Sequence, residues 1–219
     1  MPYARSRRLI ELLAIDQPWV GELFVRRARK RNGHARDEAH WDQLYAEGEY
    51  DRLWRNDQRY HQRLLASLIS ARRPHPALLD IGCGEGAFYD SLRQHAPSSY
   101  LGVDISNRAI ERAKARFGDA AAPGPVRFEQ GDAARFAVTE TFDAIVFSEC
   151  VEYFDDIESV VAHYRRSLRP GGIIGLTSWL AVRQLRIWRK LKTIATVEDE
   201  SVVFSQWGGA WIVAVLSPK

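Results

Sequence analysis

The sequence predicts an α/β protein built on one seven-stranded, mostly parallel β-sheet. From residue 77 onward, short apolar runs alternate with stretches of helical periodicity, which is typical of parallel strands joined by crossover helices. The last two apolar runs are joined through Trp207-Gly208-Gly209, and this glycine-rich connection indicates a β-hairpin. We therefore expect helices on both faces of the sheet and an antiparallel pair of strands at its end.

The elements follow one another without space for an inserted domain. A helix is expected at 57–71, because its residues show a helical apolar stripe and two prolines follow them. The stripe is assigned to Tyr60, Leu64, Leu65 and Leu68. The expected strands are 77–82, 99–104, 126–132, 142–148, 171–178, 201–206 and 210–217, the expected helices between them are 86–95, 107–117 and 157–168, and 179–200 is expected to be largely one helix.

The N-terminal 36 residues differ from the rest of the chain in charge. They carry a formal net charge of +6 and resemble a helical arm interrupted at Pro18, whereas the remaining residues carry −3. This distribution argues against a general nucleic-acid-binding surface and leaves the arm as the part that can contact an anionic partner. Trp41 and Tyr45 follow the arm four residues apart, so they share one side of a helix.

The composition limits the class of protein. Only two cysteines occur among 219 residues, Cys83 and Cys150, which excludes a disulfide framework and indicates a reducing compartment. The N-terminus lacks the apolar stretch of a signal peptide, and no run approaches 18 consecutive apolar residues. We expect a cytoplasmic protein without a transmembrane helix, whose residues 1–36 can contact the inner face of a membrane.

The glycine-rich segment LLDIGCGEGA, residues 78–87, carries the strongest local signal. Its G-x-G-x-x-A pattern, with Asp104 about 20 residues further on, is compatible with dinucleotide binding. However, Asp80 and Glu85 add two carboxylates, and no Lys or Arg occurs in residues 78–92 to offset a pyrophosphate. A ligand with a ribose, an amino group and a sulfonium, but no phosphate, fits these charges better. S-adenosylmethionine is such a ligand.

Three aspartates, Asp80, Asp104 and Asp132, each stand at the end of a predicted strand. The carboxyl ends of parallel strands converge on the ligand crevice of an open sheet, so the three carboxylates are expected there together. Asp104 is placed to accept both ribose hydroxyls, and Asp132 lies where an adenine amino group would be. The alternative is that each aspartate only caps the helix that follows it.

The segments LLDIGCGEGAF, LGVDIS, FEQGDAARF, FDAIVFSECVEYF and LRPGGIIGLTS resemble, in this order, the successive motifs of class I S-adenosylmethionine-dependent methyltransferases. The resemblance covers about residues 40–219. It implies a Rossmann-like sheet of order 3-2-1-4-5-7-6, an arm and cofactor lid at 1–55, and a cofactor-binding domain at 56–219. It also implies cofactor contacts from Tyr45, Asp80, Gly82, Cys83, Gly84, Gly86, Asp104, Ile105, Asp132, Ala133, Ser148 and Glu149, with Trp41 in the lid.

The residues after the fourth strand bear on the methyl acceptor. Relatives that methylate amides and exocyclic amines carry Asn/Asp-Pro-Pro-Tyr/Phe there, whereas this chain has Ser148-Glu149-Cys150-Val151. The segment from Glu149 to Tyr153 is similar to a metal-binding E-x-x-E-H motif, but Tyr153 replaces the histidine, and we expect no metal. The expected acceptor is a small polar molecule, with a sugar or glycan-biosynthesis intermediate as the first candidate, methylated on oxygen or nitrogen. The basic arm would also suit a phosphorylated, nucleotide-linked or lipid-linked sugar.

Three residues are candidates for the catalytic site: His61, Glu149 and Tyr153. His61 is the candidate base, Glu149 is expected to shape the methionine pocket, and Tyr153 is expected to face the acceptor. His61 lies near the start of the helix at 57–71, on its apolar side, so a core role is the alternative to a base. Two other functions stay open at this point. A nicotinamide-dependent dehydrogenase is disfavoured by the loop carboxylates, and an RNA-directed or non-catalytic adenosyl-binding protein would use the basic arm.

Overall fold

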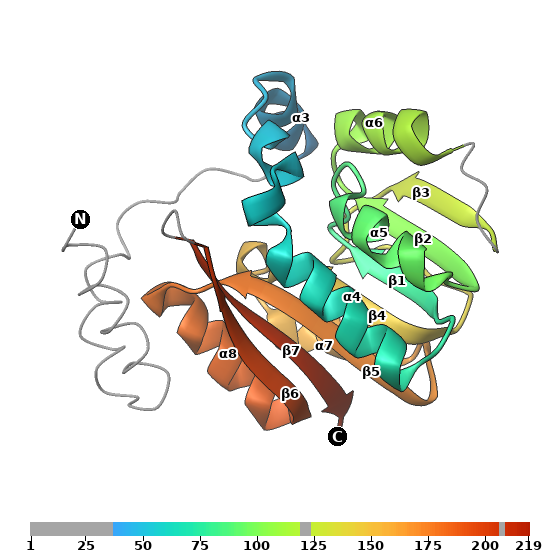
Figure 1. Cartoon of the computed structure of the whole chain (residues 1–219), viewed down its shortest axis with the longest axis vertical. Coiled ribbons are helices and arrows are strands. Elements are labelled where there is room, and N and C mark those ends of the chain that lie inside the picture. The colour runs from blue at the N-terminus through green and yellow to red at the C-terminus, as the bar shows by residue number, and fades with distance from the viewer. Residues whose placement is uncertain (1–36, 119–123, 206–208) are drawn as a thin grey trace.

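The sheet of the computed structural model has seven strands in the order β3-β2-β1-β4-β5-β7-β6 (Figure 1). Strands β1 to β5 pair in parallel, and β7 pairs antiparallel with both β5 and β6. The structure describes residues 37–118, 124–205 and 209–219. Both the predicted fold class and the implied strand order are therefore confirmed, while the expected arm at 1–36 lies outside the described residues.

The strands occur close to their predicted positions. They are β1 Ala77–Ile81, β2 Ser99–Asp104, β3 Val126–Gln130, β4 Phe142–Ser148, β5 Leu168–Trp179, β6 Ala195–Phe204 and β7 Ala210–Pro218. The α-helices are α3 Glu38–Ala46, α4 Tyr60–Arg72, α5 Ala87–Leu92, α6 Asn107–Phe117, α7 Ile157–Arg165 and α8 Val182–Ile194, with short 3-10 helices η1 Asp51–Trp54, η2 Asn56–Gln58, η3 Arg93–His95 and η4 Val151–Tyr153.

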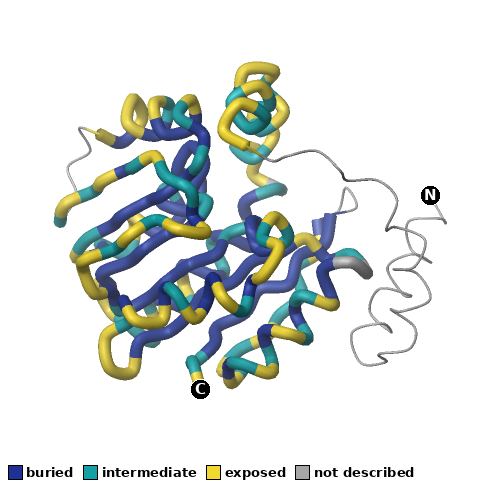
Figure 2. The backbone as a smooth tube through the Cα atoms, turned by 180° about the vertical axis from the view of Figure 1, so that it is seen from behind, coloured by how far each residue is buried: buried dark blue, intermediate teal, exposed yellow. Residues whose placement is uncertain are grey.

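The strands are the buried layer of the molecule (Figure 2). Successive side chains of a strand point to opposite faces, so each buried strand supplies two cores. Leu78 belongs to the core under α4, α5 and α6, whereas its neighbour Leu79 belongs to the core under α7 and α8. This two-sided burial explains why the strands are continuous apolar runs rather than alternating ones.

Two predicted details of the helices are wrong. The buried face of α4 is formed by His61, Gln62, Leu65, Ala66 and Ile69, while Tyr60 is 50% exposed. A tyrosine at the first position of a helix can turn its ring to solvent, and the i, i+4, i+8 row from His61 faces the sheet instead. In addition, the helix expected at 179–200 ends at Ile194, because the following residues form the first half of β6.

Strand β6 is the edge of the sheet and begins six residues earlier than the sequence indicated. Residues Ala195 to Phe204 pair with β7 along their whole length, with one irregularity between Val197 and Asp199. Charged residues in the middle of this strand gave no apolar signal, and they suit an edge strand that faces water on one side. Within the described ranges, no helix combines the length and apolarity needed to cross a membrane.

Candidate functional site

A cavity of about 690 Å³ opens at the carboxyl ends of the parallel strands. One half is formed by the glycine loop after β1 and by the ends of β2 and β3, and we call it the cofactor half. It is lined by Gly82, Cys83, Gly84, Asp104, Ile105, Asp132 and Ala133. The other half, the acceptor half, is formed by residues 37–55, which we call the lid, by η4 and by the start of α8. It is lined by Trp41, Tyr50, Arg52, Glu149, Glu152, Tyr153, Trp179 and Gln184.

The glycine loop depends on backbone conformations that favour glycine. Gly82, Gly84 and Gly86 all have positive φ angles, of 69°, 53° and 81°. A Cβ on Gly82 would lie 2.7 Å from Cβ of Cys150, and one on Gly84 would lie 2.6 Å from the Tyr45 hydroxyl. These two positions therefore have no room for a side chain, because Cys150 and Tyr45 pack directly against the loop where it lines the cavity.

Asp104 is the central acceptor of the cofactor half. Its two carboxylate oxygens accept hydrogen bonds from the Gly84 and Ser106 amides, at 2.8 and 2.9 Å. Burial raises the pKa of Asp104, although these amide bonds oppose the rise. Asp132 is more exposed, and its carboxylate binds the Ala134 amide and the Arg135 guanidinium. Both oxygens of Asp104 and Oδ1 of Asp132 accept one of these hydrogen bonds each and can accept a second, so both aspartates can serve a ligand as well as the fold.

Asp80 and Gly86 do not line the cavity, although the resemblance assigned them to the cofactor. Asp80 is fully buried behind the loop, where it accepts a 2.6 Å hydrogen bond from the Tyr100 hydroxyl. Burial raises its pKa to about 7, against the effect of that hydrogen bond. Gly86 caps α5, and a Cβ there would press on Phe117. Both residues shape the loop from behind.

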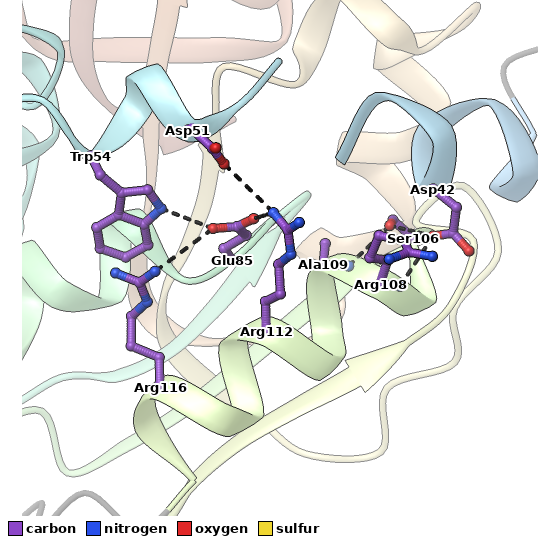
Figure 3. A network of polar contacts seen from close by, with 9 residues as sticks. All are labelled: Asp42, Asp51, Trp54, Glu85, Ser106, Arg108, Ala109, Arg112 and Arg116. Carbon is purple, nitrogen blue, oxygen red and sulfur yellow. Dashed lines mark hydrogen bonds and ion pairs between the residues drawn. The ribbon is translucent and has the colours of Figure 1, made fainter. Parts of the chain in front are cut away.

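Glu85 does not add an unpaired negative charge to the glycine loop, although the sequence predicted that no basic residue offsets it. Arg112, from α6, places its guanidinium 2.6 Å from one Glu85 oxygen, and the Trp54 indole N–H donates to the other at 2.9 Å (Figure 3). Arg116 stacks over the Trp54 ring at 3.6 Å and completes this cluster. The basic partners come from a helix some 27 residues further along the chain, so no local sequence window could reveal them.

The lid is held on α6 at two points. Besides the contacts of Trp54, Asp42 of α3 accepts hydrogen bonds from the Ser106 hydroxyl at 2.5 Å and from the Arg108 amide at 3.1 Å (Figure 3). Tyr45 of α3 is buried against the glycine loop. The predicted helix with Trp41 and Tyr45 on one side is present as α3, and both residues line the cavity.

Glu149 stands at the junction of the two halves. Its backbone has a φ of 56°, which is uncommon for a residue with a side chain and often marks a functional site. The Trp211 indole N–H donates to one carboxylate oxygen at 2.7 Å, and Nε2 of His61 lies 3.4 Å from the other. Burial pushes the Glu149 pKa up, but the His61 charge and these contacts outweigh it and lower the pKa.

His61 itself does not line the cavity. Its ring is fully buried, stacks on Trp211 with centroids 4.7 Å apart, and contacts Glu149, which does line the cavity. Tyr153, the third candidate, does line the cavity, and its ring packs edge-on against Trp41 at 4.7 Å. Burial raises the Tyr153 pKa further above its usual range, so the phenol stays protonated at neutral pH and can donate but not accept a proton.

Several cavity residues gave no signal in the sequence. Gln62 lies on the buried face of α4, where its amide approaches the Ser148 hydroxyl at 3.5 Å. Gln184 comes from α8, and the carboxamide oxygens of both glutamines are buried without a hydrogen-bond partner among the described residues. Trp179, at the end of β5, packs against Trp211. In a sequence, an isolated polar residue within a helix looks like an ordinary surface residue. Only the tertiary packing therefore identifies these residues as part of the cavity.

The site fits a ligand with a ribose and a positive charge. The glycine loop lines the cavity, Asp104 supplies a fixed acceptor, and Glu149 adds a carboxylate where the cofactor half meets the acceptor half. Both cysteines are free and buried, and burial raises their pKa values, so neither offers a thiolate. Among the described residues, no group of three His, Cys, Asp or Glu side chains is arranged to hold a metal ion.

Comparisons with known proteins agree with this description. A family model described as "Methyltransferase domain" matches residues 79–176. The chain is 36% identical over 129 residues to nocamycin O-methyltransferase from Saccharothrix syringae, covering 58% of this chain and 45% of that protein. It is 33% identical over 131 residues to nodulation protein S from Rhizobium tropici, covering 56% and 52%. The chain thus spans about half the length of these curated relatives.

One solved structure illustrates the similarity of fold. The N-methyltransferase NodS from Bradyrhizobium japonicum, in complex with S-adenosyl-L-homocysteine, superposes with a TM-score of 0.65 at 21% sequence identity. The superposition covers 77% of this chain and 91% of that one. At this sequence identity, the comparison shows that the two proteins share a fold.

Proposed function

The chain belongs to the class I S-adenosylmethionine-dependent methyltransferases, and on this premise we propose that it methylates a small polar acceptor, with a sugar or glycan-biosynthesis intermediate as the first candidate. S-adenosylmethionine supplies a methyl group on a positively charged sulfur. The residues suited to hold it are those of the cofactor half, with Asp104 on the ribose, Asp132 near the adenine, and Ser148 and Gln62 at the methionine end.

The size and lining of the acceptor half support a small acceptor. Both ligands must share one cavity of about 690 Å³, and the lid covers it from the side of α3. Aromatic rings from Trp41, Tyr153 and Trp179 offer flat apolar surfaces for the faces of a ring, while Glu149 and Gln184 offer hydrogen-bond acceptors. Such a combination suits a compact molecule that carries hydroxyl or amino groups.

The observation that carries the proposal is the position and support of Glu149. It follows β4 directly, at the point where the cofactor half meets the acceptor half, and it is oriented by Trp211 and His61. A carboxylate fixed in this way can orient the nucleophile and receive its proton while the methyl group is transferred. His61 acts through Glu149, so we assign it a positioning role rather than that of a base in direct contact with the acceptor.

Replacing Glu149 tests this function. In Glu149→Gln, we expect turnover to fall by about 10²–10⁴-fold, the usual range for a lost proton acceptor, when S-adenosylhomocysteine release is measured with a metabolite library as acceptor. Glu140→Gln is the matched control, because Glu140 pairs with Arg127 just before β4 begins, away from the cavity. Turnover of Glu149→Gln within a few-fold of the wild type would refute the role of Glu149.

A further inference from the structure

The charges of the acceptor half are unequal. Glu149 and Glu152 lie in its wall, and Asp155 and Asp156 lie exposed at its rim. Asp156 is engaged in capping α7 through Ser159, but its charge remains. Arg52, itself exposed, is the one cationic side chain among the described residues that line the cavity. A phosphate or carboxylate on the acceptor would therefore face a net repulsion, which argues against the phosphorylated acceptor expected from the sequence.

The hydrogen-bonding groups of the acceptor half also favour a ligand that carries hydrogen-bond donors. The Gln184 side chain is 92% buried, yet its carboxamide oxygen has no partner within the described part of the chain. A buried acceptor without a hydrogen-bond partner destabilises the folded protein unless a ligand or a water molecule donates a hydrogen bond to it. Together with the carboxylate of Glu149, it gives this half a surplus of acceptors. The complementary ligand must bring several N–H or O–H donors to one end.

Aromatic side chains enclose the same space. Trp41 and Tyr153 meet edge-on at 4.7 Å, and Trp179 is 37% exposed next to Trp211. Aromatic faces attract organic cations, and more strongly where water is excluded. A protonated amine carries a positive charge and up to three N–H donors, and it satisfies the carboxylates, the carboxamide and the rings at once.

We propose that the acceptor half binds a protonated amine next to Glu149 and that the reacting atom of the acceptor is its nitrogen. This inference deepens the proposed function and rests on it. It restricts the acceptor to an amine-bearing molecule, such as an amino sugar, and excludes simple alcohols and anionic acids.

Proton bookkeeping also favours nitrogen over oxygen. The ammonium gives one proton to a Glu149 oxygen, and the N–H bond breaks with its electron pair left on nitrogen. That pair forms the new N–C bond to the methyl carbon, while the electrons of the broken C–S bond stay on sulfur. Glu149, whose side chain is 21% exposed, then releases the proton to solvent. A firmly ionised carboxylate is too weak a base for a hydroxyl, whose proton is held far more tightly than that of an ammonium.

A binding experiment separates the amine from its neutral and anionic counterparts. The full chain, saturated with S-adenosylhomocysteine so that no turnover occurs, is titrated with benzylamine, benzyl alcohol and benzoate at neutral pH by calorimetry. We expect benzylamine to bind at least tenfold more tightly than benzyl alcohol, and benzoate to bind most weakly. Glu149→Gln should remove most of the preference for benzylamine, whereas the control Glu140→Gln should retain it.

The inference is overturned if benzyl alcohol or benzoate binds as tightly as benzylamine, if benzylamine fails to bind at millimolar concentration, or if Glu149→Gln leaves the preference intact. A chain that does not bind S-adenosylhomocysteine at all would overturn the proposed function together with this inference, and that failure is visible before any amine is added. As an independent readout, methyl label transferred from S-adenosylmethionine into a cell extract should appear in products retained by a cation exchanger. Label found only in unretained products would contradict methylation of nitrogen.

Discussion

The two halves of the cavity are built in different ways. The cofactor half is formed by short segments that follow β1, β2 and β3, and its main contacts are made by backbone groups and by Asp104. The acceptor half is assembled from side chains distant in the sequence, such as Glu149 and Trp211, which are 62 residues apart. The first half therefore depends on local chain geometry, and the second depends on how helices and strands pack. Substitutions in the two halves should consequently fail in different ways.

Replacing Asp80 tests whether this residue belongs to the cofactor half or only supports the glycine loop from behind. It is also the substitution with the largest expected effect on stability. The folded-state pKa of Asp80, about 7, lies above the unfolded value near 3.9, so the folded state binds the extra proton between about pH 4 and 7. Its contribution to the free energy of unfolding is therefore lost as pH rises through this window, by up to about 4 kcal/mol. Asp80→Asn should be free of this loss, so its stability relative to the wild type should increase from pH 4 to pH 8.

Chemical denaturation at several pH values measures this difference, and Asp143→Asn serves as the control because Asp143 pairs with Arg169 and lies outside the cavity wall. Since Asp80 lies behind the loop, affinity for S-adenosylhomocysteine should stay within a few-fold. A loss of affinity as large as that of a cavity residue would place Asp80 among the cofactor contacts after all.

His61 tests the acceptor half. Its charge and its contact with Oε2 keep the Glu149 pKa low, so His61→Ala should let that pKa rise. The carboxylate then becomes protonated at a higher pH, and the acidic limb of the kcat–pH profile should move toward higher pH. Turnover near neutral pH should fall by less than in Glu149→Gln. Trp211→Phe, which removes the 2.7 Å hydrogen bond to Oε1, should shift the limb in the same direction. If the acidic limb of the kcat–pH profile does not shift in either variant and only the melting temperature falls, His61 has a structural role in the core and does not position Glu149.

Arg112 tests the contacts between α6 and the lid, and the expected effect is the smallest. Its guanidinium lies 3.6 Å from Asp51 of the lid and also holds Glu85, which accepts a hydrogen bond from the Trp54 indole. The Arg112–Glu85 ion pair has one partner 37% exposed, so we expect about 1 kcal/mol or less from it. Arg112→Met should weaken S-adenosylhomocysteine binding by a few-fold and speed hydrogen exchange in residues 37–55. Arg127→Met, which breaks the exposed pair with Glu140, is the control and should change neither quantity. Unchanged exchange in the lid of Arg112→Met would show that Asp42 and Tyr45 hold it without this pair.

The same contrast explains how far the sequence could predict the structure. Strands β1 to β4, the glycine loop and Asp104 follow from local patterns, because apolar runs, glycine spacing and strand ends are read directly along the chain. The pairing of Glu85 with Arg112 and the support of Glu149 by Trp211 arise from packing between remote elements. The sequence predicted that His61 lies on the apolar side of its helix. Its stacking on Trp211 could not be predicted, because the two residues are far apart in the sequence. Polar residues such as Gln184 could not be distinguished from surface positions for the same reason.

The most direct test of the central claim, that the cofactor half is a methyl-donor site with Asp104 as its acceptor, is a calorimetric comparison of two ligands. S-adenosylhomocysteine should bind the wild-type chain with one-to-one stoichiometry, and NAD should bind far more weakly. Asp104→Ala should lose two hydrogen bonds to a charged acceptor, each worth about 1.5–3 kcal/mol, and therefore most of the affinity for S-adenosylhomocysteine. NAD binding as tight as that of S-adenosylhomocysteine, or an Asp104→Ala variant with undiminished affinity, would contradict the account.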